Sequence, residues 1–78
     1  MNRTHKFTLV ASGLDPEAND FEDRFFEAGC DDATISIQKG VILLEFARAA
    51  PSFAKALISA IADVQRAGAN VPALHAKS

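Results

Sequence analysis

The sequence predicts an α+β fold, and three observations support that prediction. Two helical patterns alternate with four stretches of strand pattern, glycines stand where the helices should end, and a Lys-Gly pair separates two adjacent strands. The chain has 78 residues, of which 49% are hydrophobic, so it can form one small core. We therefore expect a single α+β domain over residues 1–78.

The middle of the chain contains the first predicted helix. Good helix formers lead to Gly29, which can adopt the positive φ that closes a helix, so this helix should end near Ala28. Its start is predicted at Asp15 or at Asn19, because either side chain could cap it. Its buried stripe should comprise Phe21, Phe25 and Ala28, with Phe26 beside them.

Two strands follow this helix. Residues 33–38 alternate apolar and polar side chains, which is typical of a strand with one buried face. The segment Gln38-Lys39-Gly40 predicts a hairpin turn into a strand over 41–47. Because that strand is apolar on both faces until Glu45, it is predicted to be central in the sheet.

The two ends of the chain supply the other elements. A first strand is predicted over 5–12, and a last strand over 70–76, where Pro72 permits only an edge position. Between them, Ser52 should cap the longest helix and Gly68 should end it. The predicted buried stripe of that helix comprises Phe53, Ala54, Leu57, Ile58, Ile61, Val64 and Ala67.

The order β-α-β-β-α-β predicts a ferredoxin-like sandwich, a four-stranded antiparallel sheet with two helices on one face. The first and third strands are then central. The face without helices would carry an apolar interface made of Thr8, Val10, Val41 and Leu43. We expect a homo-oligomer formed through this open sheet face or through an edge strand, and another protein partner is possible. The alternative is a scatter of exposed aliphatic side chains without function.

Charge is distributed unevenly along the chain. Residues 15–32 hold one base, Arg24, and eight acids: Asp15, Glu17, Asp20, Glu22, Asp23, Glu27, Asp31 and Asp32. The basic residues elsewhere are too sparse for a surface that follows a phosphate backbone, so nucleic-acid binding by this chain alone is not expected. An antitoxin-like role would have to use Arg48, Lys55 and Arg66.

The residues capable of chemistry form no recognisable site. Cys30 is the single cysteine, which excludes an internal disulfide, and it is interpreted as a small buried residue. A metal site would draw on scattered residues without ligand spacing, namely His5, Cys30, Asp31, Asp32 and His75. We therefore expect no catalytic residues, no metal and no cofactor, and the protein should not be an enzyme. With no long apolar run and no signal peptide, we expect a cytoplasmic protein that does not bind membranes.

Three segments carry a resemblance to a known family: F-T-L-V-x-S-G-L, E-A-G-C-D-D-A-T and S-A-I-x-D-V-x-x-A-G. In these the chain resembles the N-terminal domain of small bacterial proteins described as DNA-binding or helix-turn-helix regulators, over residues 7–68. In longer members a helix-turn-helix follows the last strand, and this chain stops at Ser78, so that element is expected to be absent. Ala47 stands where relatives carry an acid, beside Arg48.

The resemblance implies an accessory or self-associating module. The leading functional hypothesis is a non-enzymatic bacterial interaction or oligomerisation module related to transcriptional regulators. The alternatives are a small-molecule-sensing regulatory domain and the antitoxin-like protein associated with nucleic acid.

Overall fold

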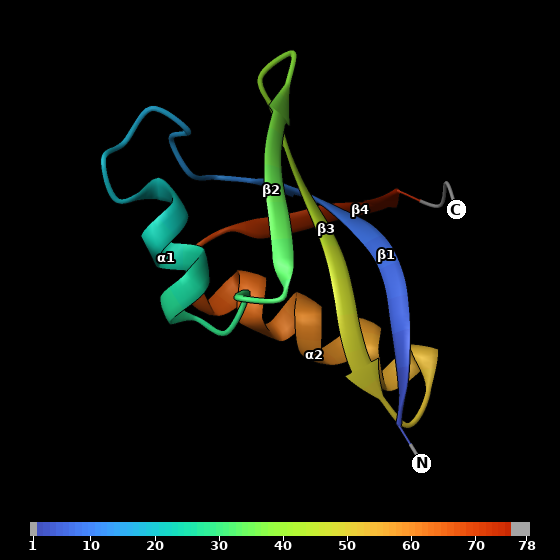
Figure 1. Ribbon diagram of the computed structural model, residues 1–78. Coiled ribbons are helices and arrows are strands. Elements are labelled where there is room, and N and C mark those ends of the chain that lie inside the picture. Colours follow the sequence, from blue (N-terminus) through green and yellow to red (C-terminus); the bar gives the residue numbers. More distant parts are fainter. Residues whose placement is uncertain (1, 76–78) are drawn as a thin grey trace.

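A computed structural model describes residues 2–75 of the chain (Figure 1). Its elements in chain order are β1 (Arg3–Ser12), α1 (Phe21–Glu27), β2 (Ala33–Gln38), β3 (Val41–Ala50), α2 (Phe53–Arg66) and β4 (Asn70–His75). The fold is α+β, as the sequence predicts. No helix in the described part of the chain is long and apolar enough to cross a membrane.

The four strands form one antiparallel sheet in the order β2-β3-β1-β4. The first and third strands are central, and β4 with its Pro72 lies at an edge, so three sequence-based expectations are confirmed. In Figure 1, α2 lies behind the sheet and α1 lies beyond the edge strand β2. The sheet face turned towards the viewer is therefore not covered by α2.

The core lies on the other face of the sheet. Alternate side chains of β1 and β3 point into it, and both helices contribute residues to the same cluster. Its largest fully buried side chains are Phe25, Leu9, Leu44, Val64 and Cys30. The residues of β1 and β3 that alternate with the predicted open-face positions are all buried: Phe7, Leu9, Ile42, Leu44 and Phe46.

The hairpin between β2 and β3 is the tight turn that its sequence indicates. Lys39 has a φ of 53° and Gly40 a φ of 79°, and Gln38 pairs with Val41. Two successive positive φ angles define a type I′ turn, whose twist matches that of the flanking strands. The turn therefore sets the register in which β2 pairs with β3.

Both predicted helix C-termini and the predicted cap of α2 are confirmed, whereas the predicted start of α1 is wrong. Gly29 and Gly68 follow the two helices with φ of 111° and 101°, and the Ser52 side chain accepts a hydrogen bond from the Lys55 N–H. The predicted caps of α1 at Asp15 and Asn19 are wrong, because the helix begins at Phe21. The Asp15 carboxylate instead accepts from the Glu17 N–H at 2.9 Å, which holds a turn in the preceding loop.

The buried stripe of α2 differs from the predicted one. Ala56, Ala60 and Val64 are fully buried, whereas Ile58 is 67% exposed and Phe53 is 44% exposed. The small alanine side chains allow the helix axis to approach the sheet, and this close packing turns the larger Ile58 outward. The hydrophobic spacing alone could not distinguish these two faces of an alanine-rich helix.

Two strands are longer than predicted. β1 begins at Arg3, and β3 runs on to Ala50, with Arg3 opposite Ala50 and His5 opposite Arg48. The alanines near the end of β3 have low strand propensity, but pairing with β1 keeps them extended. The last position of the predicted final strand, Ala76, lies outside the described residues.

Candidate functional site

The four residues of the predicted interface lie on the sheet face opposite the core. Val10 and Leu43 are direct cross-strand partners at the centre of the sheet, and both are half-buried. Val41 is 41% exposed, and Thr8 is half-buried opposite Glu45. The face therefore has an aliphatic centre formed by two neighbouring strands.

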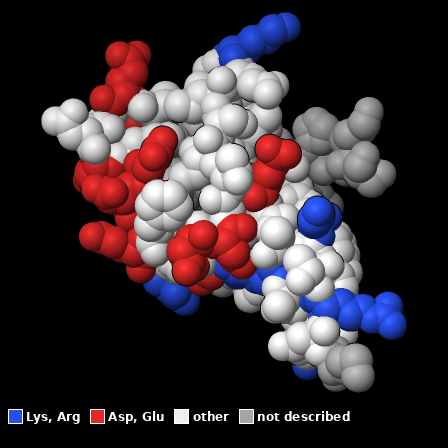
Figure 2. Space-filling view, in the orientation of Figure 1, with Lys and Arg blue, Asp and Glu red and all other residues white. Residues whose placement is uncertain are grey.

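Small and hydroxyl side chains share this face with the aliphatic centre and with Glu45. Those on the same face of β2 and β3 are Thr34, Ser36, Ala47 and Ala49. Figure 2 looks onto this face and shows many acids on the side of α1, with further red and blue groups on the central and right-hand surface. Lys6 and Glu45 also stand on this face, and Glu45 lies opposite Thr8, so another flat surface would meet these two charges as well.

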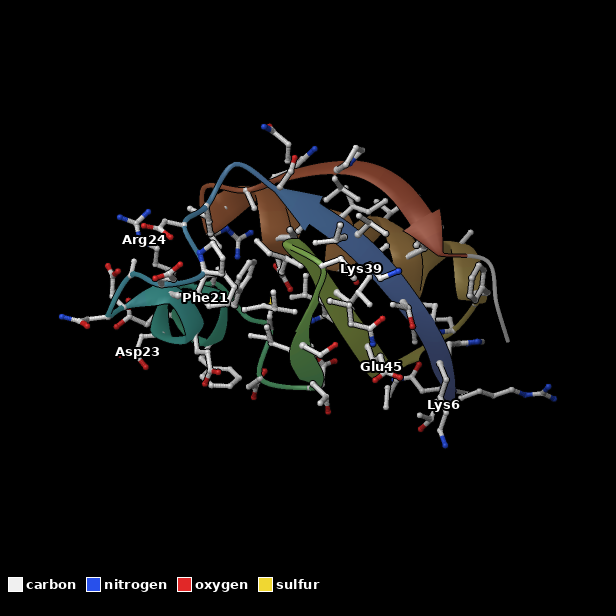
Figure 3. All side chains as sticks on the ribbon, turned by 90° about the horizontal axis from the view of Figure 1, so that it is seen from above. Lys6, Phe21, Asp23, Arg24, Lys39 and Glu45 are labelled. Carbon is white, nitrogen blue, oxygen red and sulfur yellow. The ribbon has the colours of Figure 1, made fainter. Side chains whose placement is uncertain are left out.

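A shallow depression of about 410 Å³ lies on the β1 and β3 strands. Lys6, Thr8, Thr34 and Glu45 contribute to its lining. Figure 3 shows Lys6 and Glu45 on the same side of the sheet, and these two opposite charges form no ion pair with each other among the described residues. Their charges are therefore available to a ligand or to another chain.

Behind the sheet, Arg48 organises a network of ions that the sequence did not reveal. Its guanidinium binds the Asp32 carboxylate with two hydrogen bonds, from Nε at 2.8 Å and from Nη2 at 2.9 Å. Nη1 donates to Asp63 at 2.9 Å and to the Ser59 hydroxyl at 3.1 Å, and Nη2 also donates to the Gly29 carbonyl at 2.9 Å. All five N–H donors of Arg48 are thus in use.

The network joins three parts of the chain. Asp32 precedes β2, Arg48 lies near the end of β3, and Asp63 lies in the last turn of α2. The side chain of Arg48 is only 11% exposed, and its guanidinium carbon also lies 5.0 Å from the centroid of the Phe46 ring. Arg66 extends the network, because its Nη1 donates to Asp63 at 3.2 Å and to the Ala28 carbonyl at 3.1 Å.

Hydrogen bonding dominates the electrostatics of the Arg48–Asp32 pair. The hydrogen bond from Arg48 holds the pKa of the Asp32 carboxyl below its ordinary value, although partial burial opposes the shift. The hydrogen bond to Asp32 likewise raises the pKa of Arg48, and Asp63 adds to this effect. Both groups therefore stay charged at neutral pH.

This network changes the interpretation of Arg48 and Asp32. Arg48 is not free to contact nucleic acid, since its donors are satisfied within the chain. Asp32 is an ion-pair partner of Arg48 rather than a metal ligand among the described residues. One signal in the sequence could have revealed this arrangement: Arg48 continues the inward-facing positions of Leu44 and Phe46, where a charge needs partners.

The other candidate residues for chemistry do not converge. Cys30 is fully buried in the core as predicted, and burial, reinforced by Asp63, raises the pKa of its thiol to about 11. His5 lies at the far end of β1, where its Nε2 is 3.3 Å from the Ala50 carbonyl oxygen. Among the described side chains, those of residues 2–72, no three metal-ligating groups come together, and the side chain of the candidate His75 lies outside this range.

Comparisons of the chain with protein-family models, with curated proteins and with solved structures found no match.

Proposed function

We propose that this chain is a non-enzymatic interaction module that binds a second copy of itself through the open sheet face. The interface comprises Thr8, Val10, Val41 and Leu43. On this proposal the module serves a small bacterial regulator in the cytoplasm, as the three sequence segments that resemble such regulators indicate.

The proposal includes a ferredoxin-like arrangement. The strand order β2-β3-β1-β4 supports it, together with one helix in the β1–β2 connection and one in the β3–β4 connection. In this arrangement the helices and the open sheet face are separate surfaces. The open face can therefore take part in assembly while the core stays intact.

The single observation that carries the proposal is the aliphatic centre of the open face. Val10 and Leu43 lie side by side on the two central strands, and Val41 extends the patch towards the hairpin. Two sheets pack face to face at about 10 Å when their side chains interdigitate. In such a pair, Lys6 and Glu45 of one copy would have to meet opposite charges on the second copy. A small domain also gains stability from such burial, because its own core is limited.

The non-enzymatic character is supported by how the reactive groups are used. Among the described residues, the groups with shifted pKa values are Cys30, Asp32 and Arg48, and they belong to the core and to the ion network. Their shifts have structural causes, namely burial and ion pairing. None of them is left over as an activated acid, base or nucleophile.

A matched pair of substitutions tests the proposed interface. Leu43→Lys should shift the sedimentation-equilibrium mass towards that of the monomer, because it places a charge in the aliphatic centre. Ile58→Lys makes the same kind of change on the exposed side of α2, where Ile58 is 67% exposed, and should leave the assembly unchanged. The proposal is wrong if Leu43→Lys assembles as the parent protein does.

A second candidate function is supported by the depression on the same face. Lys6 and Glu45 offer both signs of charge near the Thr8 and Thr34 hydroxyls, a combination suited to a small zwitterionic metabolite. The test is to measure the melting temperature with each metabolite of a panel, because a ligand that binds the folded state raises it.

The antitoxin-like alternative can no longer use Arg48, whose donors are satisfied within the chain. A mobility shift with DNA at low salt would be needed to support it.

A further inference from the structure

The two edges of the sheet differ in their protection against further strand pairing. The β4 edge contains Pro72, and its pairing with β1 is irregular between Val10 and Ser12. The β2 edge is a regular six-residue strand, ATISIQ, with no proline and no charged residue. Proline, bulges and charges are the usual devices that keep an edge strand from accepting another strand. Only β2 lacks all of them.

The unpaired backbone groups of β2 can be assigned from the ladder. The Ala47 N–H donates to the Asp32 carbonyl at 3.1 Å, and Gln38 pairs with Val41 across the two-residue turn. Hydrogen-bonded positions alternate in an antiparallel pair, so Thr34, Ser36 and Gln38 bond to β3. The N–H and C=O groups of Ile35 and Ile37 therefore point to the edge.

Exposed apolar side chains lie on β2 and on the helix beyond it. Ile37 is 45% exposed even though its cross-strand neighbour Ile42 is buried. Phe26 on α1, the helix that lies beyond β2 in Figure 1, is also 45% exposed. The edge thus offers both backbone hydrogen bonds and apolar contact, which are the two requirements for binding an extended peptide.

The charges near this edge decide which kind of strand would bind. Of the eight acids between residues 15 and 32, only Asp20 and Asp32 form ion pairs among the described residues. Figure 2 shows the acids gathered on the α1 side of the molecule, next to β2. A second copy would bring an equally acidic surface against them, whereas a basic segment would be attracted.

We propose that the β2 edge binds an extended basic segment of a partner protein by strand addition. Main-chain hydrogen bonds to Ile35 and Ile37 hold the segment in an antiparallel register. Alternate apolar residues of the segment cover Ile37, and its lysines or arginines face the acids on the α1 side of the edge. This surface is distinct from the open sheet face, so the inference does not depend on self-association.

A fluorescent peptide that alternates lysine and valine, blocked at both ends, serves as the probe. Titration at low salt should give saturable anisotropy, and the amide resonances of Ile35 and Ile37 should shift. N-methylation of the valine amides should weaken binding by about tenfold or more, because it removes the donors that strand pairing needs. A glutamate-for-lysine version of the peptide should bind far more weakly.

One pair of variants completes the test. Ile37→Lys should weaken binding of the probe, whereas Ile58→Lys adds the same charge on α2 and should have little effect. The inference is overturned if the probe does not bind, if the N-methylated or glutamate peptide binds equally well, or if the shifts map to α1 alone. A monomeric mass would refute the proposed self-association and leave this result intact.

Discussion

Arg48 and Asp32 form a two-pronged ion pair, with Nε–Oδ2 and Nη2–Oδ1 distances of 2.8 and 2.9 Å. This ion pair links the C-terminal end of β3 to the segment that precedes β2. Asp63 binds the same guanidinium from α2, so one side chain connects the sheet to its longest helix. The stability of the folded chain should therefore depend on Arg48.

Replacing Arg48 with alanine should lower the free energy of unfolding by about 2 to 3 kcal/mol, because two partly buried carboxylates lose their partner. Urea denaturation measures the loss. Arg24→Ala is the matched control: its pair with Asp20 is exposed, with side-chain exposures of 51% and 59%. That variant should lose less than about 1 kcal/mol. Equal losses in the two variants would contradict a structural role for the network.

The ion pair also predicts how stability depends on pH. The pKa of Asp32 is lower in the folded protein than its ordinary value of 3.8, so its contribution is complete above that value. The contribution is lost as the pH falls through the lowered pKa. Asp32→Asn should therefore flatten the acid limb of a plot of urea midpoint against pH.

The control for this pH effect is Asp32→Asn in a protein whose Arg48 is already replaced. In an Arg48→Met background, Asp32→Asn should leave the shape of the acid limb unchanged, because no guanidinium remains to lower the pKa of Asp32. An unaltered acid limb in the Asp32→Asn single variant would argue against the ion pair in solution.

Gly29 and Gly40 allow backbone strain to be separated from crowding. Both have positive φ, 111° and 79°, so alanine is strained at either position, at a cost of roughly 1 to 2 kcal/mol. At Gly29 an added Cβ would also lie 2.9 Å from Asp63 Oδ2, whereas nothing lies within 4 Å at Gly40. Gly29→Ala should therefore melt at a clearly lower temperature than Gly40→Ala, and equal melting temperatures would refute this contact.

Cys30 should be almost unreactive in the folded protein. Its side chain is fully buried and the pKa of its thiol is raised to about 11, so little thiolate is exposed to a reagent at pH 8. Alkylation by iodoacetamide should be slow in buffer and fast in urea. The raised pKa also predicts that stability falls as the pH rises from 9.0 towards 11, since the unfolded chain loses this proton first. Rapid alkylation in buffer would show that Cys30 is accessible.

Local signals explain why much of the fold could be predicted from the sequence. The hairpin at Lys39-Gly40, the stops at Gly29 and Gly68 and the cap at Ser52 all depend on neighbouring residues. The assignment of Thr8, Val10, Val41 and Leu43 to one face of the sheet likewise follows from the two-residue repeat of a strand.

What the sequence did not reveal depends on contacts between distant segments. The partners of Arg48 lie 16 and 15 residues away, at Asp32 and Asp63, so no short motif announces them. The exposure of Ile58 similarly follows from how closely the alanines of α2 approach the sheet.

The solution mass of the purified chain tests the proposed self-association most directly. Size-exclusion chromatography with light scattering, over a range of concentrations, should give twice the chain mass of 8.3 kDa. The measured mass should fall towards that of a monomer only at the lowest protein concentrations. A mass of 8.3 kDa at every concentration would contradict the account and leave the open sheet face to a different ligand.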